Sequence, residues 1–221
     1  MFNKNISIAI DGPAGAGKST IAKKIAEELC IEYIDTGAMY RALTLKVLQL
    51  QLNPKDENDV IAAIQNTNVD FRNNDIYLDD INVEKQIREN IINNNVSFVA
   101  KVKEVREAMV NRQRELSKMK SIIMDGRDIG SVVLPNAEFK FFITATVDER
   151  ANRRYKELIG KGETDISFEQ IRQEIEDRDK IDMTRDIAPL IQTKDACKID
   201  TTNMTINECV AKIISIVKGG N

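Results

Sequence analysis

The clearest fold signal in the chain is Ile6-Ser7-Ile8-Ala9-Ile10, followed after Asp11 by Gly12-Pro13-Ala14-Gly15-Ala16-Gly17-Lys18-Ser19. The first five residues form a short apolar run, which is typical of a β-strand covered on both faces. The segment from Thr20 to Cys30 then repeats apolar residues at helical spacing, at Ile21, Ala22, Ile25, Ala26 and Leu29. A strand, a glycine-rich turn and a helix in this order form the first half of a β-α-β unit.

The glycine-rich turn at residues 12–19 fits the phosphate-binding pattern G-x-x-x-x-G-K-[ST] at every position. Glycines let successive backbone N–H groups point into one concavity, and the helix N-terminus adds the positive end of its dipole. Lys18 can reach the β- and γ-phosphates, and the Ser19 hydroxyl can ligate Mg²⁺. We therefore predict a nucleoside triphosphate site made of Gly12, Pro13, Ala14, Gly15, Ala16, Gly17, Lys18, Ser19 and Thr20.

The rest of the chain alternates strand patterns with helical patterns. Further strands are expected at Ser121 to Met124, Phe139 to Ala145 and Lys198 to Asp200, with a shorter strand that ends at Ile34. Helices are expected at Ala38 to Leu50, Lys101 to Met119, Asp148 to Ile159, after Ser167 with its capping-box partner Gln170, and at Thr205 to Val217. This alternation predicts the α/β class, with a mainly parallel sheet and helices on both faces.

One segment interrupts this alternation. Short β-like pieces at 69–71, 76–78 and 81–83 are separated by Asn and Asp residues, which predicts a small antiparallel meander. We interpret residues 55–96 as an insertion in a single domain of 221 residues. The asparagine-rich stretch Asn90 to Asn95 disfavours a regular helix and is expected to be either a hinge of this insertion or a solvated loop.

Composition excludes several classes of function. Lys and Arg number 32 against 35 Asp and Glu, so no overall basic field favours nucleic acid as a partner. The chain has no histidine, which excludes Ser-His-Asp chemistry and any histidine-ligated metal. The three cysteines lack C-x-x-C spacing, so we expect free, buried thiols in a reducing compartment. Neither a signal peptide nor an apolar run of ~18 residues is present, so we expect a cytoplasmic protein without a membrane segment.

Arginines supply the next indication. They follow predicted strands or gather on predicted helices, at Arg41, Arg127, Arg150, Arg153, Arg154, Arg178 and Arg185. A guanidinium suits phosphate because its planar fork donates two parallel hydrogen bonds and keeps its charge. A single arginine is more often a solvated surface charge, but arginines collected at strand ends and around the loop indicate a site that binds anions. If the acceptor is a phosphate monoester, whose second pKa is about 6, its oxygen is already largely ionised and no histidine base is needed.

The chain resembles the bacterial cytidylate kinases, a family of nucleoside monophosphate kinases. The resemblance rests on blocks that occur in family order and cover nearly the whole chain, most weakly between about 45 and 95: Ile10 to Ser19, Asp35-Thr36-Gly37-Ala38-Met39-Tyr40-Arg41, Val105 to Ala108, Asp125-Gly126-Arg127-Asp128-Ile129-Gly130, Glu149 to Arg154, Arg178-Asp179-x-x-Asp182-x-x-Arg185 and Ala188 to Leu190.

The resemblance implies a P-loop fold with five parallel strands, an acceptor-binding insertion at the meander, and a lid at about 150–165. It implies transfer of a phosphoryl group from Mg²⁺-bound ATP to CMP or dCMP, by a protein that we expect to be monomeric. The implied catalytic residues are Lys18, Arg127, Arg150 and Arg154. The implied CMP-binding residues are Thr36, Tyr40, Arg41, Ser97, Arg106, Arg127, Asp128, Arg178, Asp182 and Arg185.

Within that set, Ser97, Arg106 and Asp128 would face the cytosine, and Arg41 and Arg127 would hold the acceptor phosphate. A carboxylate such as Asp128 can accept a hydrogen bond from the N4 amine of cytosine, where uracil presents another acceptor. Some relatives have serine at the position of Thr36 or arginine at that of Ile181, so the choice between ribose and deoxyribose stays open.

Three alternatives also stay open. The chain could phosphorylate a different small acceptor, or bind ATP without turnover. It could also be a guanine-nucleotide switch, although the nearest approach to the [NT]-K-x-D element is Thr193-Lys194-Asp195-Ala196, where the aspartate falls one position early.

Overall fold

The computed structural model of the chain describes residues 5–65, 67–72, 75–118, 120–160, 162 and 166–219. The chain divides into two compact units. The first unit comprises Met1–Glu32 and Lys120–Asn221, and the second comprises Tyr33–Met119. The predicted lid includes residues 161 and 163–165, which lie outside the described part of the chain.

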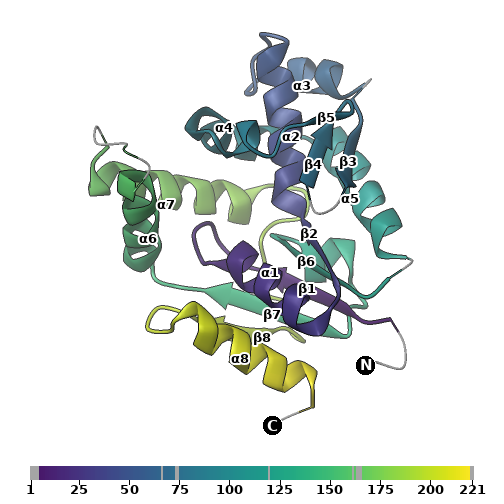
Figure 1. Ribbon diagram of the computed structural model, residues 1–221. Helices are drawn as coiled ribbons and strands as arrows, with labels where there is room; N and C mark the ends of the chain where they lie inside the picture. The colour runs from purple at the N-terminus through teal and green to yellow at the C-terminus, as the bar shows by residue number, and fades with distance from the viewer. Residues whose placement is uncertain are drawn as a thin grey trace. The chain divides into compact units, whose positions relative to one another are not determined.

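A five-stranded parallel sheet confirms the predicted fold class. Its strand order is β2-β6-β1-β7-β8 (Figure 1), with β1 Ser7–Asp11, β2 Glu32–Asp35, β6 Ile122–Gly126, β7 Phe139–Thr144 and β8 Cys197–Asp200. The central strand β1 is almost fully buried, as its apolar run predicts. The parallel register sets Ile10 beside Asp125 and Asp11 beside Gly126. The phosphate-binding loop and the Asp125–Asp128 motif therefore start at the same edge of the sheet.

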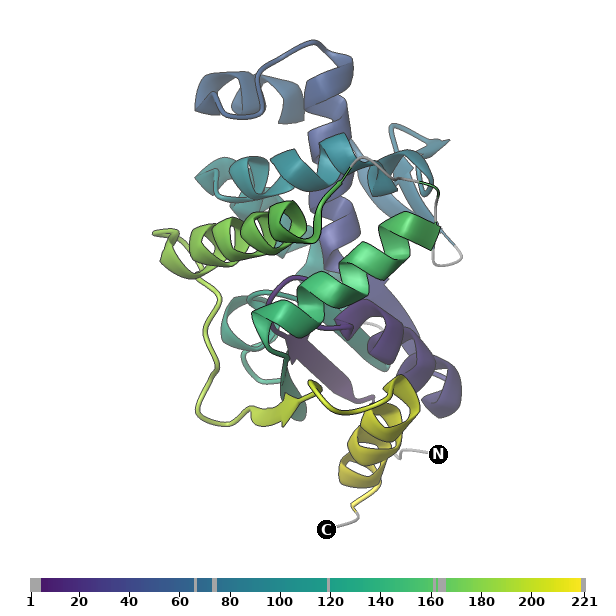
Figure 2. The same cartoon turned by 90° about the vertical axis from the view of Figure 1, so that its left-hand side faces the viewer.

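The first unit also contains four α-helices and a short π-helical segment among its described residues. They are α1 Lys18–Leu29, α6 Val147–Gly160, α7 Phe168–Thr184 and α8 Ile206–Val217, with the π-helical η2 Ile129–Val133. Helix α1 packs against β1 and β6 of the sheet, whereas α6 and α7 pack against each other. Figure 1 shows α1 beside α8, and Figure 2 shows the same unit from a second side. The predicted capping box Ser167–Gln170 is present at the start of α7, and a second one, Thr205–Glu208, starts α8.

The second unit is built around one buried helix. Its elements are α2 Thr36–Gln49, α3 Glu57–Ile64, β3 Val69–Arg72, β4 Asp75–Leu78, β5 Ile81–Asn82, η1 Gln86–Arg88, α4 Asn90–Ala100 and α5 Lys103–Ser117. Helix α2 packs against α3, α4 and β4, and its apolar residues join one continuous core. The predicted meander is confirmed as the antiparallel sheet β3-β4-β5. Two of its predicted turn residues, 73 and 74, lie outside the described part, as does 119, the predicted end of α5.

The expectation for Asn90 to Asn95 is wrong, because this stretch begins helix α4. Ile92 and Val96 of the helix are buried in the core of the second unit. The Asn93 and Asn95 side chains donate hydrogen bonds to backbone carbonyls four residues earlier, at 3.2 and 2.9 Å. Burial of the apolar face thus outweighs the weak helix propensity of asparagine. The sequence reading also missed α3, whose N-terminus is capped by the Asp56 carboxylate.

The expectation of buried thiols holds for Cys209 only. Cys30 and Cys197 are exposed, and all three cysteines are free. Among the described residues, no helix combines the length and the apolar character needed to cross a membrane.

The turn between β1 and the phosphate-binding loop requires a glycine. Gly12 has a φ angle of 149°, and a Cβ atom there would lie 1.9 Å from the carbonyl oxygen of Ile143. No side chain fits at that distance, so the loop and β7 can approach each other only because position 12 has none.

We predict that Gly12→Ala lowers the free energy of unfolding by about 2–4 kcal/mol, through backbone strain and the clash with β7. Thermal and urea unfolding would measure the change. Gly160→Ala is the matched control, because a Cβ atom there meets no atom within 4 Å, and alanine favours the helix by up to about 1 kcal/mol. Equal melting temperatures for the two variants would contradict the steric argument.

Candidate active site

The phosphate-binding loop wraps the N-terminus of α1. Gly15 and Gly17 have φ angles of 73° and 87°, and Gly17 is the N-cap of the helix that begins at Lys18. Glycine adopts this left-handed conformation without steric cost. The backbone N–H groups of the first helical turn have no helical partners, so together with the helix dipole they form an anion-binding site.

Lys18 is buried, with 5% of its surface exposed, and its Nζ donates to the carbonyl oxygen of Pro13 at 2.7 Å. Burial lowers the pKa of Lys18 well below its ordinary value, and the nearby positive charge of Arg127 lowers it further; Asp125 opposes both effects. Arg178 also adds to the lowering of this pKa. Three cationic groups thus repel one another at the loop, and a bound polyanion would relieve that repulsion.

Ser19 lies against a carboxylate that the sequence reading quoted without a role. Its hydroxyl donates to Asp125 Oδ2 at 2.8 Å, from the end of the adjacent strand β6. Hydroxyl and carboxylate oxygens are ligands that Mg²⁺ accepts, so this pair fits a metal ion. No cluster of three or more acidic or cysteine side chains suited to a metal occurs in the described ranges. A metal here would take its other ligands from phosphate oxygens and water, as Mg²⁺ commonly does.

Asp11 joins the loop to the Asp125–Asp128 motif. Its two carboxylate oxygens accept the backbone N–H groups of Ile129 at 2.8 Å and Gly130 at 2.7 Å. Burial raises the pKa of Asp11 to about 6, although these two hydrogen bonds act in the opposite direction, and the charge of Asp128 raises it slightly more. The sequence reading missed this residue; the available signal was a carboxylate at the end of an otherwise apolar strand.

Five predicted acceptor-binding residues come together in the first unit. Arg127 Nε donates to Asp182 Oδ2 at 2.8 Å, and Arg185 lies 3.7 Å from Asp128 and 3.8 Å from Asp182. Burial alone would raise the pKa of Asp182, but the guanidiniums of Arg127, Arg178 and Arg185 hold it below its ordinary value. The Arg127 guanidinium and the ionised Asp182 carboxylate therefore stabilise each other.

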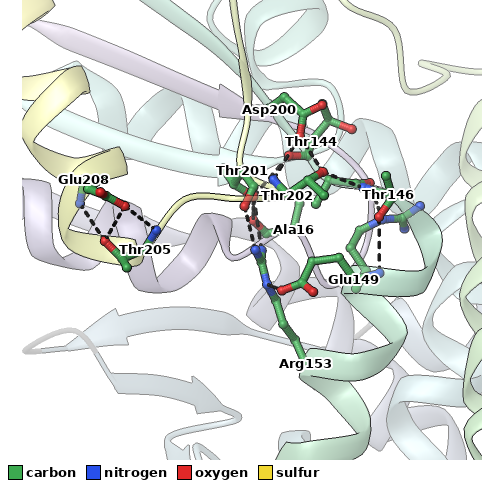
Figure 3. A network of polar contacts seen from close by, with 12 residues as sticks. Ala16, Thr144, Thr146, Glu149, Arg153, Asp200, Thr201, Thr202, Thr205 and Glu208 are labelled. Carbon is green, nitrogen blue, oxygen red and sulfur yellow. Dashed lines mark hydrogen bonds and ion pairs between the residues drawn. The ribbon is translucent and has the colours of Figure 1, made fainter.

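The arginines on α6 have different surroundings, although the sequence grouped them. Arg150 is buried and donates to backbone oxygens and a carboxylate, whereas Arg154 is partly exposed and pairs with Glu157 at 2.8 Å. Arg153 was given no role. Figure 3 shows it between Glu149 and Thr201, whose hydroxyl lies 3.5 Å from the Ala16 carbonyl oxygen of the loop.

The second unit holds the other predicted acceptor-binding residues, of which Thr36, Tyr40, Ser97 and Arg106 are buried. The Arg106 guanidinium lies 5.4 Å from the centroid of the Tyr40 ring and donates to the Ala100 carbonyl oxygen at 3.1 Å.

The fifth of these residues, Arg41, pairs with Asp35 at 2.7 Å, and Arg88, which the sequence reading missed, pairs with the same carboxylate at 3.2 Å. Burial alone would raise the pKa of Asp35, but Arg41 and Arg88 lower it. Asp35 also caps α2 by accepting the Ala38 N–H at 2.9 Å.

These features suit the binding and transfer of phosphoryl groups. The first unit brings the phosphate-binding loop together with Asp125, Arg127, Asp128, Arg178, Asp182 and Arg185, and the second unit holds Thr36, Tyr40, Arg41, Ser97 and Arg106. In-line phosphoryl transfer depends mainly on positioning and charge stabilisation, and the loop and the arginines offer both.

Solved structures resemble this chain in fold. An uncharacterized protein from Eubacterium ventriosum ATCC 27560 aligns with a TM-score of 0.53 at 16% identity, over 97% of this chain and 99% of its own. A gluconokinase from Sinorhizobium meliloti 1021 aligns with a TM-score of 0.51 at 10% identity, over 95% of this chain and 90% of its own. At these identities the similarity concerns the fold alone.

Sequence comparison is more specific. The cytidylate kinase of Clostridioides difficile (strain 630) is 52% identical over 211 residues, which cover 96% of this chain and 97% of the relative. That of Alkaliphilus oremlandii (strain OhILAs) is 53% identical over 214 residues, which cover 97% and 98%. The family model described as cytidylate kinase matches residues 8–219. The chain therefore belongs to the cytidylate kinase family, as its sequence motifs predict.

Proposed function

We propose that this chain transfers the γ-phosphoryl group of ATP to CMP and dCMP, with CDP and dCDP as products. The observation that carries the proposal is the cationic group at the phosphate-binding loop. Lys18 is buried there, and Arg127 and Arg178 lie near enough to lower its pKa. Such a concentration of buried positive charge is stable only beside carboxylates or a bound polyanion. Membership of the family, and the relatives' description as cytidylate kinases, point to the same reaction.

The phosphate-binding loop, residues 12–20, holds the phosphates of ATP in this proposal. Its backbone N–H groups and Lys18 contact the β- and γ-phosphates. Lys18, Arg127 and Arg154 stabilise the negative charge on the transferred group, as preorganised donors do in a site with little water. Arg150 belongs to the predicted catalytic set, but its contacts favour a role in positioning the loop.

Ser19 and Asp125 would hold Mg²⁺ together with the phosphates of ATP. When bound, the ion would neutralise part of the charge on the ATP phosphates. The Ser19 hydroxyl lies 2.8 Å from Asp125 Oδ2, so the two oxygens are close enough to share one cation.

In this proposal, the predicted acceptor residues bind CMP. Arg41 and Arg127 hold its phosphate, Ser97, Arg106 and Asp128 recognise the cytosine, and Thr36 and Tyr40 line the pocket. Arg178, Asp182 and Arg185 contact the sugar or the phosphate.

The acceptor oxygen is already ionised near neutral pH, so no protein group has to remove a proton. A monomeric state, a cytoplasmic location, the lid at 150–165 and the insertion at 55–96 remain predictions from the sequence.

The direct test of this function uses the four ribonucleoside monophosphates. Purified protein is mixed with ATP, Mg²⁺ and each monophosphate in turn, and ADP release is followed. We expect CMP to be used with a kcat/KM about tenfold or more above that of UMP, because an aspartate at the base opposes the O4 acceptor of uracil. Equal use of UMP and CMP would overturn the assignment to cytidylate.

Asp128 is the residue that we expect to carry this preference. Asp128 is buried, 4% exposed, within the arginine cluster. Asp128→Ala should lose most activity on CMP and much less on UMP, so the ratio of the two kcat/KM values narrows. An equal fall for both acceptors would mean that Asp128 shapes the pocket without reading the base.

A substitution at Lys18 tests the proposed binding of the phosphoryl donor, ATP. Lys18→Ala should lower kcat by about 100-fold or more, since a cation at the migrating phosphoryl group is lost. Its melting temperature should stay close to that of the wild type, because burial and Arg127 already disfavour the charged form of Lys18 and hold its pKa down in the folded protein. Lys23→Ala, at an exposed position of α1, is the control. Near wild-type turnover in Lys18→Ala would remove the proposal.

The pH dependence of the rate distinguishes protonation of the substrate from protonation of the protein. We expect the rate to fall below about pH 6 as the CMP phosphate is protonated. Unfolding is not the cause there: the pKa of Asp11 is raised to about 6, so its contribution to stability is fully present below 3.8 and is lost only as pH rises through 6. Asp35 and Asp182 have lowered pKa values, so their stabilisation is lost only as pH falls below 3.8.

A CMP analogue with a lower second phosphate pKa should move this acid limb to lower pH. Thermal melts across the same range supply the control for stability. An acid limb that does not move with the analogue would point to a protein carboxylate, and Asp11 would be the first candidate.

A further inference from the structure

Ala14, within the phosphate-binding loop, is held at both of its backbone groups by one ion pair. Its N–H donates to Asp179 Oδ1 at 3.3 Å, and its carbonyl oxygen accepts from Arg150 Nη1 at 3.0 Å. The same Arg150 nitrogen lies 2.6 Å from Asp179 Oδ2. The three groups form a closed ring of polar contacts around a single peptide position.

Both charged side chains are buried, Arg150 with 4% and Asp179 with 8% of its surface exposed. Arg150 comes from α6 and Asp179 from α7, and these helices pack through a small apolar cluster of Ala151, Leu158, Ile171 and Ile175. Arg150 Nε also donates to the Ala145 carbonyl oxygen at 3.0 Å, at the end of β7. The packing of α6 against α7 and the hydrogen bond to Ala145 therefore hold the pair in place independently of its contacts with the loop.

Gly15 makes this approach possible. A Cβ atom at Gly15 would lie 3.2 Å from the Cβ of Arg150, which is tighter than ordinary van der Waals contact. The Arg150 side chain thus lies directly against the loop, and its guanidinium is directed to backbone and carboxylate oxygens in the protein interior.

We propose that Arg150 and Asp179 are positioning residues for the nucleotide. By engaging both backbone groups of Ala14, the pair orients the following N–H groups, from Gly15 to Ser19, toward one concavity. The inference rests on the ATP binding proposed above and adds Asp179, a residue without any role in the sequence reading. It also assigns to Arg150 a function that acts through the loop and not by contact with phosphate.

Charge makes the proposal testable. Without Arg150, the Asp179 carboxylate would stay buried beside a loop that has to bind a triphosphate, and it would repel that ligand. Removal of the Asp179 charge in the same molecule should then restore part of the affinity. If Arg150 acted only by direct contact with the phosphates, Asp179→Asn by itself would not weaken nucleotide binding, because the guanidinium would still be present.

The experiment compares Arg150→Met, Asp179→Asn and the double variant with the wild type. Affinity for a fluorescent ATP analogue with Mg²⁺ is measured without acceptor, and KM for ATP, KM for CMP and the melting temperature are measured separately. Asp177→Asn is the matched control, because Asp177 is exposed on the same helix and accepts a hydrogen bond from Gln173 at 2.9 Å.

We expect Arg150→Met to lower the affinity for the analogue by about tenfold or more, as the loss of a buried charged hydrogen bond implies. Asp179→Asn alone should lower this affinity less, because the amide oxygen of the new side chain still accepts the Ala14 N–H. The double variant should bind more tightly than Arg150→Met. KM for CMP should change much less than the affinity for the analogue in all three, since Arg127 and Arg41 keep their ion pairs with Asp182 and Asp35.

Two results would overturn the inference. One is an unchanged analogue affinity in Arg150→Met or Asp179→Asn with a lowered melting temperature, which would make the pair purely structural. The other is a double variant no better than Arg150→Met. If Arg150→Met does not fold, Asp179→Asn against Asp177→Asn decides: weaker analogue binding by the former supports the inference, and equal binding overturns it. Wild-type protein that binds the analogue but phosphorylates no monophosphate overturns the proposed function only.

Discussion

The Asp11 carboxylate lies at the end of the central strand and accepts the backbone N–H groups of Ile129 and Gly130. Because β1 and β6 run parallel in register, this contact joins the phosphate-binding loop to the motif that carries Asp125, Arg127 and Asp128. Burial of this carboxylate costs free energy, since it raises the pKa of Asp11 to about 6 in spite of two short hydrogen bonds. The site keeps an acidic group there because no apolar side chain could satisfy both N–H groups.

A second constraint is the balance of buried charge. Arg127 pairs with Asp182, Arg150 with Asp179, and Arg41 with Asp35. Each pair holds a guanidinium in place at a desolvation cost that only good hydrogen-bond geometry offsets. Lys18 differs from these arginines, because burial and Arg127 lower its pKa more strongly than Asp125 raises it. An incoming phosphate group would stabilise its charged form.

Helix α7 connects two of these pairs. Asp179 holds Ala14 of the loop, and Asp182, three residues later, holds Arg127. Residues three apart in a helix lie on the same face, so one helix face carries carboxylates for both the donor loop and a proposed acceptor arginine. Glycine at position 12 complements this arrangement from the sheet, since any side chain there would collide with β7.

The local features of this protein could be predicted from its amino-acid sequence. The apolar run before Gly12 predicted a buried strand, the complete pattern of residues 12–19 predicted the phosphate-binding loop, and Ser167 with Gln170 predicted the start of α7. These predictions succeed because strand burial, glycine conformations and helix caps depend on neighbouring residues. The family could also be recognised from its ordered motifs, and comparison with known proteins confirms it.

The pairing of the buried charges, in contrast, follows from the three-dimensional fold. Nothing in the spacing of Asp11, Asp125 or Asp179 indicates that they contact Ile129, Ser19 and Arg150, because those contacts span 29 to 118 positions and depend on strand order and helix packing. The same holds for Asn90 to Asn95, where burial of Ile92 and Val96 in the second unit's core overrides local propensity. Residues distant in sequence bury these arginines, and a buried charge without a partner is costly in free energy. Each buried arginine is therefore paired with a carboxylate or a carbonyl oxygen that the fold brings near it.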